Sequence, residues 1–292
     1  MFCFLLQMAD LLSRVNCDVR TVGGGVVVVD RATALPYTYT TQTLHDQVVA
    51  GVVAYVQREV MEGELGMRRV ELAGGVVRSG EGGESGESGY VYASQGVVEE
   101  EHQKETLVLV VQGRGVGNRC GVWDACKCVE EEITRNSQIP YLRTIAARQW
   151  DVIVLNPNQP HVYRGPHSRL PIKNVEYVWE SLITARTHSY TNIYIIAHTH
   201  GAQRITNLLE SYDTAKEVIT KICFIDGEFR HTSDDICEVL ATRGKTWVSC
   251  SLPAGTTPPY HPLTLVMPCV SAGDVQRPWA ACQESVFEFL SE

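Results

Sequence analysis

The 292-residue sequence has no long hydrophobic run: no stretch approaches the roughly 20 apolar residues that a membrane-spanning helix needs. Positive charge is also scarce, since 25 Lys and Arg stand against 34 Asp and Glu, a formal net charge of −9. An acidic chain has no overall attraction for nucleic-acid phosphates, and no run of basic residues compensates for this. We therefore expect no membrane insertion and no direct nucleic-acid binding.

No secretory leader is recognisable. Residues 1–6 are apolar, but they lack a basic segment and are shorter than the apolar core of a signal peptide. The ten cysteines are therefore expected to be mostly buried thiols in a reducing compartment. Cys120, Cys126 and Cys128 lack the Cys-x2-Cys spacing of a zinc knuckle, so structural thiols are the favoured interpretation; a fourth ligand such as His102 keeps a metal alternative open.

Composition divides the chain into three parts. Residues 8–75 hold a β-branched run at 26–29 and an amphipathic helix over 43–64, and we expect this N-terminal extension to pack on the main domain. Residues 76–104 include a Gly-, Ser- and Glu-rich tract that cannot offset its ordering entropy, which predicts a flexible acidic loop. Residues 105–292 form the main domain.

Continuous apolar runs of strand length alternate with helical patterns in the main domain. Such runs indicate burial on both faces, as in parallel sheets. Amphipathic spacing over 175–183 and 205–212 predicts helices between the strands. The alternation predicts an α/β fold with a doubly wound, mainly parallel sheet. The expected strands are residues 107–111, 152–155, 193–197, 222–225 and 246–249.

The turn after the third expected strand carries the most informative residues. His198-Thr199-His200-Gly201 leads from this strand into a helix, the arrangement at which α/β-hydrolases expose their nucleophile. A sheet of α/β-hydrolase type is therefore the expected architecture, with Gly201 allowing helix and strand to approach. Thr199 stands at the exposed position, where its β-branched side chain crowds a strained turn. We favour an inert structural elbow over an active threonine nucleophile.

A working hydrolase would need an acid and a histidine after the elbow. Asp226 ends the fourth expected strand and is the candidate acid. The later histidines are His231, which could face the same cleft, and His261, which lies in a proline-rich loop and is favoured as a loop residue. An esterase-like enzyme that uses Thr199 with Asp226 and one of these histidines is the first alternative.

A glycine-rich turn, Gln112-Gly113-Arg114-Gly115-Val116, follows the first expected strand. In α/β-hydrolases this loop supplies a backbone N–H to the oxyanion hole. Such turns occur in any α/β sheet, so the turn indicates catalysis only in combination with the elbow. No Gly-Lys-Ser/Thr follows, which excludes a P-loop.

His198 and His200 form a His-x-His pair, which makes a metal site the second alternative. The two rings would flank a turn and not share one strand face. No cluster of Asp, Glu or His follows in the helix, so the ligands are too few. We expect neither a metal nor another cofactor.

Six short segments resemble, in order and approximate spacing, the signature of the Argonaute-binding-protein domain family. This domain occurs in a small-RNA chaperone subunit, in animal cotranscriptional regulators and in fungal class II histone deacetylases. The resemblance covers roughly residues 11–292 and implies an α/β-hydrolase-like fold. The segments are Gln112-Gly113-Arg114-Gly115-Val116 with Arg119, Gly121 and Trp123; Ser137-Gln138-Ile139-Pro140-Tyr141; Val-Ile-Val-Leu-Asn-Pro-Asn at 152–158; Tyr177-Val178-Trp179; the elbow; and Val270-Ser271-Ala272-Gly273.

The departures from this family bear on catalysis. Members commonly have serine where this chain has Thr199 and a small serine where it has Arg114, and a histidine follows soon after the late Val-Ser-Ala-Gly. Here Asp274 and Val275 follow Gly273, and an arginine cannot serve as a general base because it stays protonated. We therefore lean toward a pseudo-hydrolase in which Thr199, with Asp226 and His231, is a degenerate triad.

The expected function is a non-catalytic interaction module. The family resemblance implies partners in RNA-silencing, chromatin or mRNA-related complexes and a nuclear or nucleocytoplasmic location. The acidic balance favours basic protein partners, such as histones or RNA-processing factors. The expected cleft residues are Gly113, Arg114, Gly115, Val116, His198, Thr199, His200, Gly201, Asp226 and His231.

Overall fold

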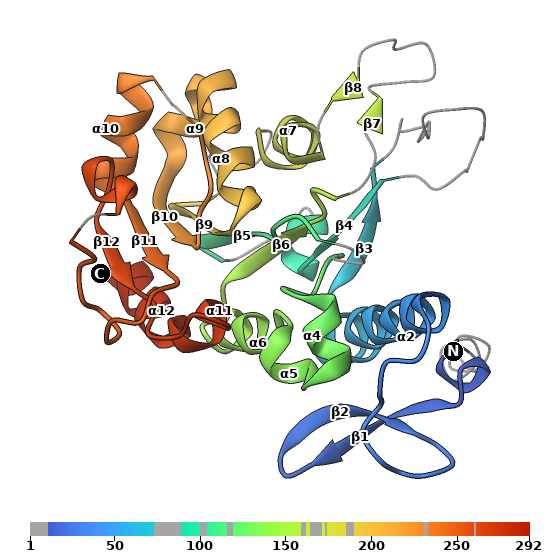
Figure 1. Ribbon diagram of the computed structural model, residues 1–292. Helices are drawn as coiled ribbons and strands as arrows, with labels where there is room; N and C mark the ends of the chain where they lie inside the picture. The colour runs from blue at the N-terminus through green and yellow to red at the C-terminus, as the bar shows by residue number, and fades with distance from the viewer. Residues whose placement is uncertain are drawn as a thin grey trace. The chain divides into compact units, whose positions relative to one another are not determined.

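The computed structural model places most of the chain in two compact units (Figure 1). The N-terminal unit combines Met1–Met67 with Gly115–Thr144, and the sheet unit combines Arg68–Arg114 with Ile145–Glu292. Each unit is thus built from two stretches of chain. The predicted linear division at residues 75 and 104 stays a prediction. The structure describes residues 11–72, 89–99, 104–115, 119–158, 162–163, 171–172, 174–184, 190–230, 233–259 and 261–292.

The N-terminal unit contains a β-hairpin. β1 (Cys17–Val22) pairs antiparallel with β2 (Gly25–Asp30), which contains the β-branched run predicted as a strand. Gly23 and Gly24 join them with φ of 59° and 88°, values that glycine adopts at no steric cost. The two-glycine turn therefore sets the register of the hairpin.

The predicted amphipathic helix is present in the N-terminal unit. α2 (Gln42–Tyr55) begins after Thr41, whose hydroxyl accepts a hydrogen bond from the Leu44 N–H, and it continues as the π-helical η1 (Val56–Glu64). Val48, Val52, Val56 and Val60, which recur at every fourth position, are buried, as their spacing predicts. The short helices of the unit are α4 (Ala125–Glu130) and α5 (Ile133–Asn136).

An eight-stranded sheet forms the centre of the sheet unit, in the order β3-β4-β6-β5-β9-β10-β11-β12. β4 runs antiparallel to both of its neighbours, and all other pairs are parallel. The five expected strands are all present, and the predicted doubly wound, mainly parallel α/β sheet is confirmed. The strands are β3 (Arg68–Glu71), β4 (Tyr90–Ala93), β5 (Thr106–Val111), β6 (Asp151–Leu155), β9 (Asn192–His198), β10 (Ile219–Ile225), β11 (Gly244–Val248) and β12 (Cys269–Ser271).

The stretch 76–104, which composition predicts to be a loop, contains part of this sheet. β4 lies within it and is followed by the short helix α3 (Gln95–Val98). Val91, Tyr92 and Ala93 are buried, so this short apolar segment forms a strand although the tract before it is polar. Residues 80–88 of that tract lie outside the described residues.

The parallel register brings the carboxyl ends of the central strands together. β5 and β9 pair from Thr106 with Asn192 to Val111 with Ala197, and β9 ends at His198 opposite Ile225 of β10. The loops that follow these three strands therefore lie together, at the carboxyl ends of the strands. Open α/β sheets place their ligand sites at these carboxyl ends.

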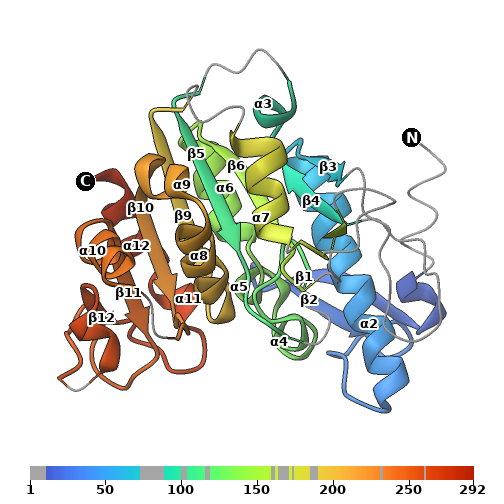
Figure 2. The ribbon, with the colours of Figure 1, turned by 90° about the horizontal axis from the view of Figure 1, so that it is seen from above.

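Helices cover both faces of the sheet (Figure 2). α7, η2, α8 and α10 lie on one face, where α8 contributes buried Ile205, Leu208 and Leu209 to the main apolar core. α11 and α12 lie on the other face, and Ser285 of α12 accepts a hydrogen bond from the Trp247 indole of β11. The bounds are α7 (Asn174–Val178), η2 (Trp179–Ile183), α8 (His200–Ser211), α9 (Asp213–Val218), α10 (Asp234–Arg243), η4 (Pro262–Leu265), α11 (Pro278–Ala281) and α12 (Gln283–Ser291).

The remaining described elements are one helix and one pair of short strands. α6 (Ile139–Ala147) precedes β6, and the two-residue strands β7 (Val162–Tyr163) and β8 (Pro171–Ile172) pair antiparallel. Within the described ranges, no helix is both long and apolar enough to cross a membrane.

Asp151 is a fully buried carboxylate at the start of β6. Its Oδ1 accepts hydrogen bonds from Ser94 Oγ at 2.7 Å and pairs with Lys104 Nζ at 3.1 Å, and its Oδ2 accepts from Tyr190 OH at 3.0 Å. Three segments far apart in the sequence are thus joined through one charge. A buried charge is tolerated only when it is paired and hydrogen-bonded in this way.

We predict that Asp151→Ala lowers the free energy of unfolding by about 3 kcal/mol, because it leaves the buried Tyr190 and the partly buried Ser94 and Lys104 without their acceptor. Urea denaturation followed by circular dichroism measures the change. Glu210→Ala, which removes an exposed carboxylate at the end of α8, serves as the control and should shift stability by less than about 0.5 kcal/mol. Equal effects of the two substitutions would contradict a structural role for Asp151.

Candidate functional site

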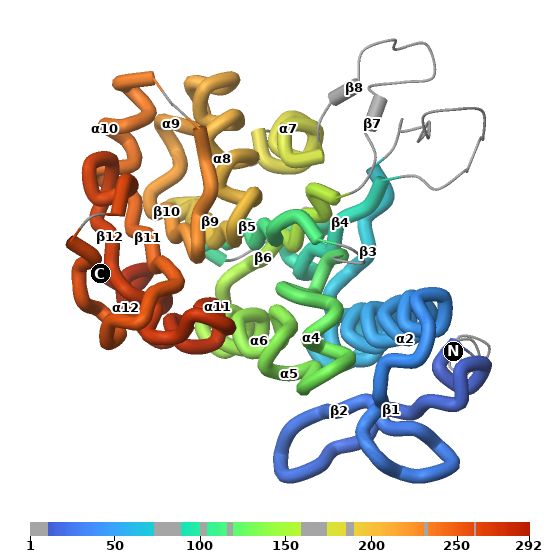
Figure 3. The backbone as a smooth tube through the Cα atoms, in the orientation of Figure 1, coloured from blue at the N-terminus to red at the C-terminus, as the bar shows by residue number. Residues whose placement is uncertain are grey.

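The backbone passes from β9 into α8 (Figure 3). Thr199 occupies the strained turn between these two elements. Its φ of 45° and ψ of −117° lie outside the regions that β-branched residues normally adopt. Backbone hydrogen bonds hold the turn: the Thr199 N–H donates to the Ile225 carbonyl at 2.9 Å, and the Thr199 carbonyl accepts from the Glu228 N–H at 3.0 Å. This is the sharp strand-to-helix geometry of a nucleophile elbow.

Two glycines let the turn pack against the end of β5. A Cβ on Gly201 would lie 2.6 Å from the Val111 carbonyl oxygen, and a Cβ on Gly113 would lie 1.8 Å from Thr199 Oγ1. The threonine hydroxyl therefore rests directly on the Cα of Gly113. No hydrogen bond joins this hydroxyl to another group in the part of the chain that the structure describes.

Asp226 lies beside the turn, at the end of β10, with a positive φ of 51°. Its Oδ1 accepts a hydrogen bond from the Ser249 N–H at 2.7 Å, and its Oδ2 accepts from the Ser249 hydroxyl. Both carboxylate oxygens thus bind the residue that follows β11. Its role as the acid of a triad stays a prediction.

The described histidines of this unit have different surroundings. His198 is buried and its ring makes an edge contact with Trp279, at 5.1 Å between centroids. His200 is exposed, and its Nδ1 lies 3.1 Å from Glu228 Oε2. His261 accepts a hydrogen bond from the Leu263 N–H at the start of η4. His231 lies outside the described residues, as do Val116 of the predicted cleft and His102.

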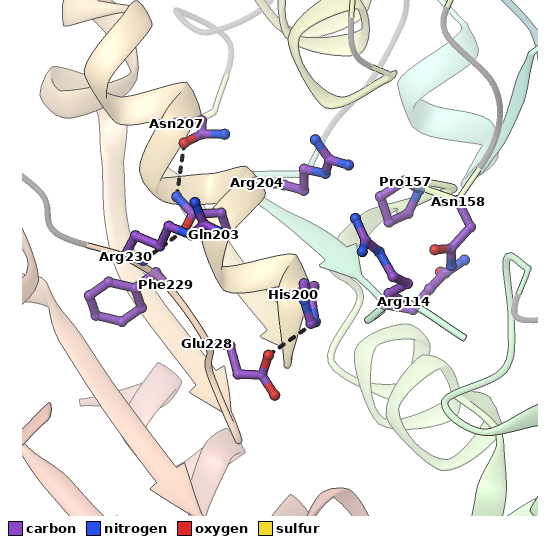
Figure 4. A pocket seen from close by; sticks show the side chains of 11 residues that line it. Arg114, Pro157, Asn158, His200, Gln203, Arg204, Asn207, Glu228, Phe229 and Arg230 are labelled. Atoms are coloured by element: carbon purple, nitrogen blue, oxygen red, sulfur yellow. Dashed lines mark hydrogen bonds and ion pairs between the residues drawn. The ribbon is translucent and has the colours of Figure 1, made fainter. Parts of the chain in front are cut away.

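A cavity of about 580 Å³ opens beside the elbow, at the carboxyl ends of the strands (Figure 4). Arg114 enters it from the loop after β5, and Arg204 from α8, and both extend toward the space in front of Pro157 and Asn158. Among the described lining residues, Glu228 supplies the one carboxylate. The lining residues are Gln112, Arg114, Pro157, Asn158, His200, Gln203, Arg204, Asn207, Glu228, Phe229 and Arg230.

Of the predicted cleft residues, Arg114 and His200 line this cavity, and Gly113 and Thr199 contact each other beside it. The other lining residues of α8, Gln203, Arg204 and Asn207, were not predicted from the sequence. Their signal is the spacing of His200, Gln203, Arg204 and Asn207, a polar stripe on one helical face. It is hidden because the opposite face of the same helix carries the apolar pattern.

Hydrogen bonds organise this wall. Gln203 Nε2 donates to Asn207 Oδ1 at 2.9 Å, and Gln203 Oε1 accepts from the Arg230 N–H at 2.7 Å. On the opposite side, Asn158 Nδ2 donates to the Gly113 carbonyl at 2.9 Å. Each loop at the mouth of the cavity is therefore tied to a neighbouring element.

The cysteines resolved in the described ranges are free thiols. Cys128 is fully buried, and burial raises the pKa of its thiol well above the usual value, with further increases from nearby Asp124. Across the same ranges, no group of three or more His, Cys, Asp or Glu side chains could hold a metal ion. Cys120, Cys126 and Cys128 therefore do not gather further ligands from those residues.

Comparison with known proteins gives distant relatives, and no family model matches the chain. It is 25% identical over 193 residues to a FAM172 family protein homolog of Caenorhabditis elegans, covering 65% of this chain and 58% of the relative. It is 22% identical over 249 residues to the cotranscriptional regulator ARB2A homolog of Gallus gallus, covering 64% and 59%. The chain thus spans less than two thirds of the length of these curated relatives.

A solved structure resembles the fold over most of its length. A histone deacetylase from Saccharomyces cerevisiae superposes with a TM-score of 0.53 at 12% identity, covering 87% of this chain and 100% of that chain. Together, the strand order and the elbow define a protein of the α/β-hydrolase type. Within this class, the chain is a distant homologue of the FAM172/ARB2A family, which confirms the resemblance found in its sequence.

We predict that Gly113→Ala lowers the free energy of unfolding by about 2 kcal/mol, because the new methyl group would overlap Thr199 Oγ1. The double variant Gly113→Ala with Thr199→Ala removes that oxygen and should recover at least about 1 kcal/mol. A double-mutant cycle by urea denaturation measures this coupling. Strictly additive effects would show that the two residues are not in contact.

Proposed function

We propose that this protein is a non-catalytic interaction module of a nuclear complex that acts during or after transcription. The observation that carries the proposal is that, among the described residues, neither a base nor an acid is hydrogen-bonded to the Thr199 hydroxyl at the elbow. The Thr199 hydroxyl lies on the Cα of Gly113, and both Asp226 oxygens bind Ser249. General-base activation of a hydroxyl requires a base within hydrogen-bonding reach, oriented by an acid.

Steric crowding supports the same conclusion. In an acyl-transfer enzyme, a substrate carbonyl fits between the nucleophile and the backbone donors of the loop after the third strand of the fold. Here the Thr199 hydroxyl lies directly against Gly113 of that loop, since a Cβ on Gly113 would lie only 1.8 Å from Thr199 Oγ1. Arg114 follows immediately and extends into the adjoining cavity. The turn is retained because it joins β9 to α8, and the site beside it has different chemistry.

The partners follow from the homologues and from charge. Cotranscriptional regulator is the description of the chicken, human and mouse relatives. A net charge of −9 favours basic proteins, such as histones or RNA-processing factors, over nucleic acid. Both arguments fit a regulatory complex in the nucleus, to which the module would contribute a binding surface.

A hydrolase that uses Thr199 is the second candidate, because the strained φ of 45° at the elbow is the conformation in which a nucleophile is presented. His231 could complete its triad only through a contact outside the described residues. The metal alternative at His198 and His200 is weaker, since the first ring faces Trp279 and the second pairs with Glu228.

A fluorophosphonate probe separates the two candidates. We predict that the purified protein stays unlabelled in a gel assay, and that Thr199→Ser also stays unlabelled, because no base is hydrogen-bonded to the hydroxyl at position 199 among the described residues. An active serine esterase serves as the positive control. Labelling of the natural chain that disappears in Thr199→Ala would overturn the non-catalytic proposal.

Affinity purification from nuclear extract tests the interaction role. We predict that the tagged chain recovers chromatin or RNA-processing proteins rich in Lys and Arg, and that recovery falls as salt rises because opposite charges attract the partners. Thr199→Ala is the matched control and should recover the same proteins. Failure to recover any such component at low salt would count against this role.

A further inference from the structure

The cavity beside the elbow concentrates positive charge within an acidic protein. Among the described lining residues there are three arginines, Arg114, Arg204 and Arg230, and one carboxylate, Glu228, which already pairs with His200. No ion pair or side-chain hydrogen bond engages the guanidinium of Arg114 or Arg204 within the described residues. These two guanidinium groups therefore have N–H donors that could bind the oxygens of an anion in the cavity.

Arg204 bears the main electrostatic cost of this arrangement. It is half-buried on α8, and burial lowers the pKa of its guanidinium, as does the nearby charge of Arg114; Glu176 acts in the opposite direction. Arg114 and Arg204 start from different elements and extend toward the same space (Figure 4). An anion between them would replace a repulsion by two attractions.

Neighbouring groups suit an organic anion more than a simple ion. The amide side chains of Asn158 and Asn207 add polar lining, and Phe229 and Pro157 offer apolar surface. At about 580 Å³, the cavity lies within the range of small-molecule sites, roughly 300–1,000 Å³, and is much larger than a lone phosphate. Fixed loops at the carboxyl ends of the strands place the cavity where such sites occur.

We propose that this cavity binds a small organic phosphate monoester, with Arg114 and Arg204 holding the phosphate and the remaining lining contacting the organic part. A phosphate monoester carries about −1.5 to −2 charges at pH 7 and three acceptor oxygens, which matches two facing guanidiniums better than a single carboxylate does. The inference goes beyond the interaction role proposed above and does not depend on it.

Isothermal titration calorimetry of the full chain tests this site. The probes are adenosine 5′-monophosphate and ribose 5-phosphate, with adenosine, ribose, acetate and inorganic phosphate as comparisons. We expect at least one phosphate ester to bind more tightly than its neutral partner and than inorganic phosphate, with affinity falling as salt rises. Absence of binding by both esters at millimolar concentration would overturn the proposal.

Variants assign the binding to the two arginines. Arg114→Gln and Arg204→Gln should each weaken the binding of the ester about tenfold or more, because each removes a charge-assisted contact. Arg69→Gln changes an exposed arginine that stacks on Tyr90, and it should alter affinity less than about twofold. Equal affinities of the three variants would show that the ester binds elsewhere.

Thermal unfolding distinguishes a lost site from a lost fold. In the absence of ligand, Arg114→Gln should unfold at or above the temperature of the natural chain, because it relieves the repulsion on Arg204. The ester should raise the unfolding temperature of the natural chain and not that of this variant. A variant that unfolds earlier and still gains stability from the ester would contradict the assignment.

Discussion

The contact between the β9–α8 turn and the end of β5 is the constraint on which the rest of the sheet unit depends. Thr199 lies on Gly113 with no room for a side chain between them, and Gly201 brings the first turn of α8 against the Val111 carbonyl. Since α8 begins at this contact, its rotation about its own axis is set there. The apolar face enters the core, and Arg204 faces the cavity.

The fold can require this turn whether or not the turn takes part in a reaction. A sharp turn is needed because a central strand of this fold passes directly into a helix. In this chain the strained backbone is kept, and the hydroxyl packs against the neighbouring loop. Asp226 has a similar structural use, because it joins the ends of β10 and β11 through Ser249. Positive charge then dominates the adjoining cavity.

Structural features that depend on interactions between neighbouring residues could be predicted from the sequence. Continuous apolar runs predicted β5, β6, β9, β10 and β11, since a strand buried on both faces must be apolar throughout. β4 and β12 were not predicted, because they are short and lie beside polar or irregular segments. The elbow and Arg114 were predicted as site residues. Arg204 and Arg230 were not, because their importance depends on which residues face them in the folded protein.

The class of fold, the position of the elbow and the relation to the FAM172/ARB2A proteins follow from the order of the amino acids, because periodicity and ordered motifs are properties of neighbouring residues. The surroundings of that elbow depend on tertiary contacts. The cavity takes residues from four segments, at 112–114, 157–158, 200–207 and 228–230, that meet through the parallel register of β5, β6, β9 and β10. Whether the charges of these segments repel or attract one another depends on the distances between them in the folded protein, and no local sequence pattern encodes those distances.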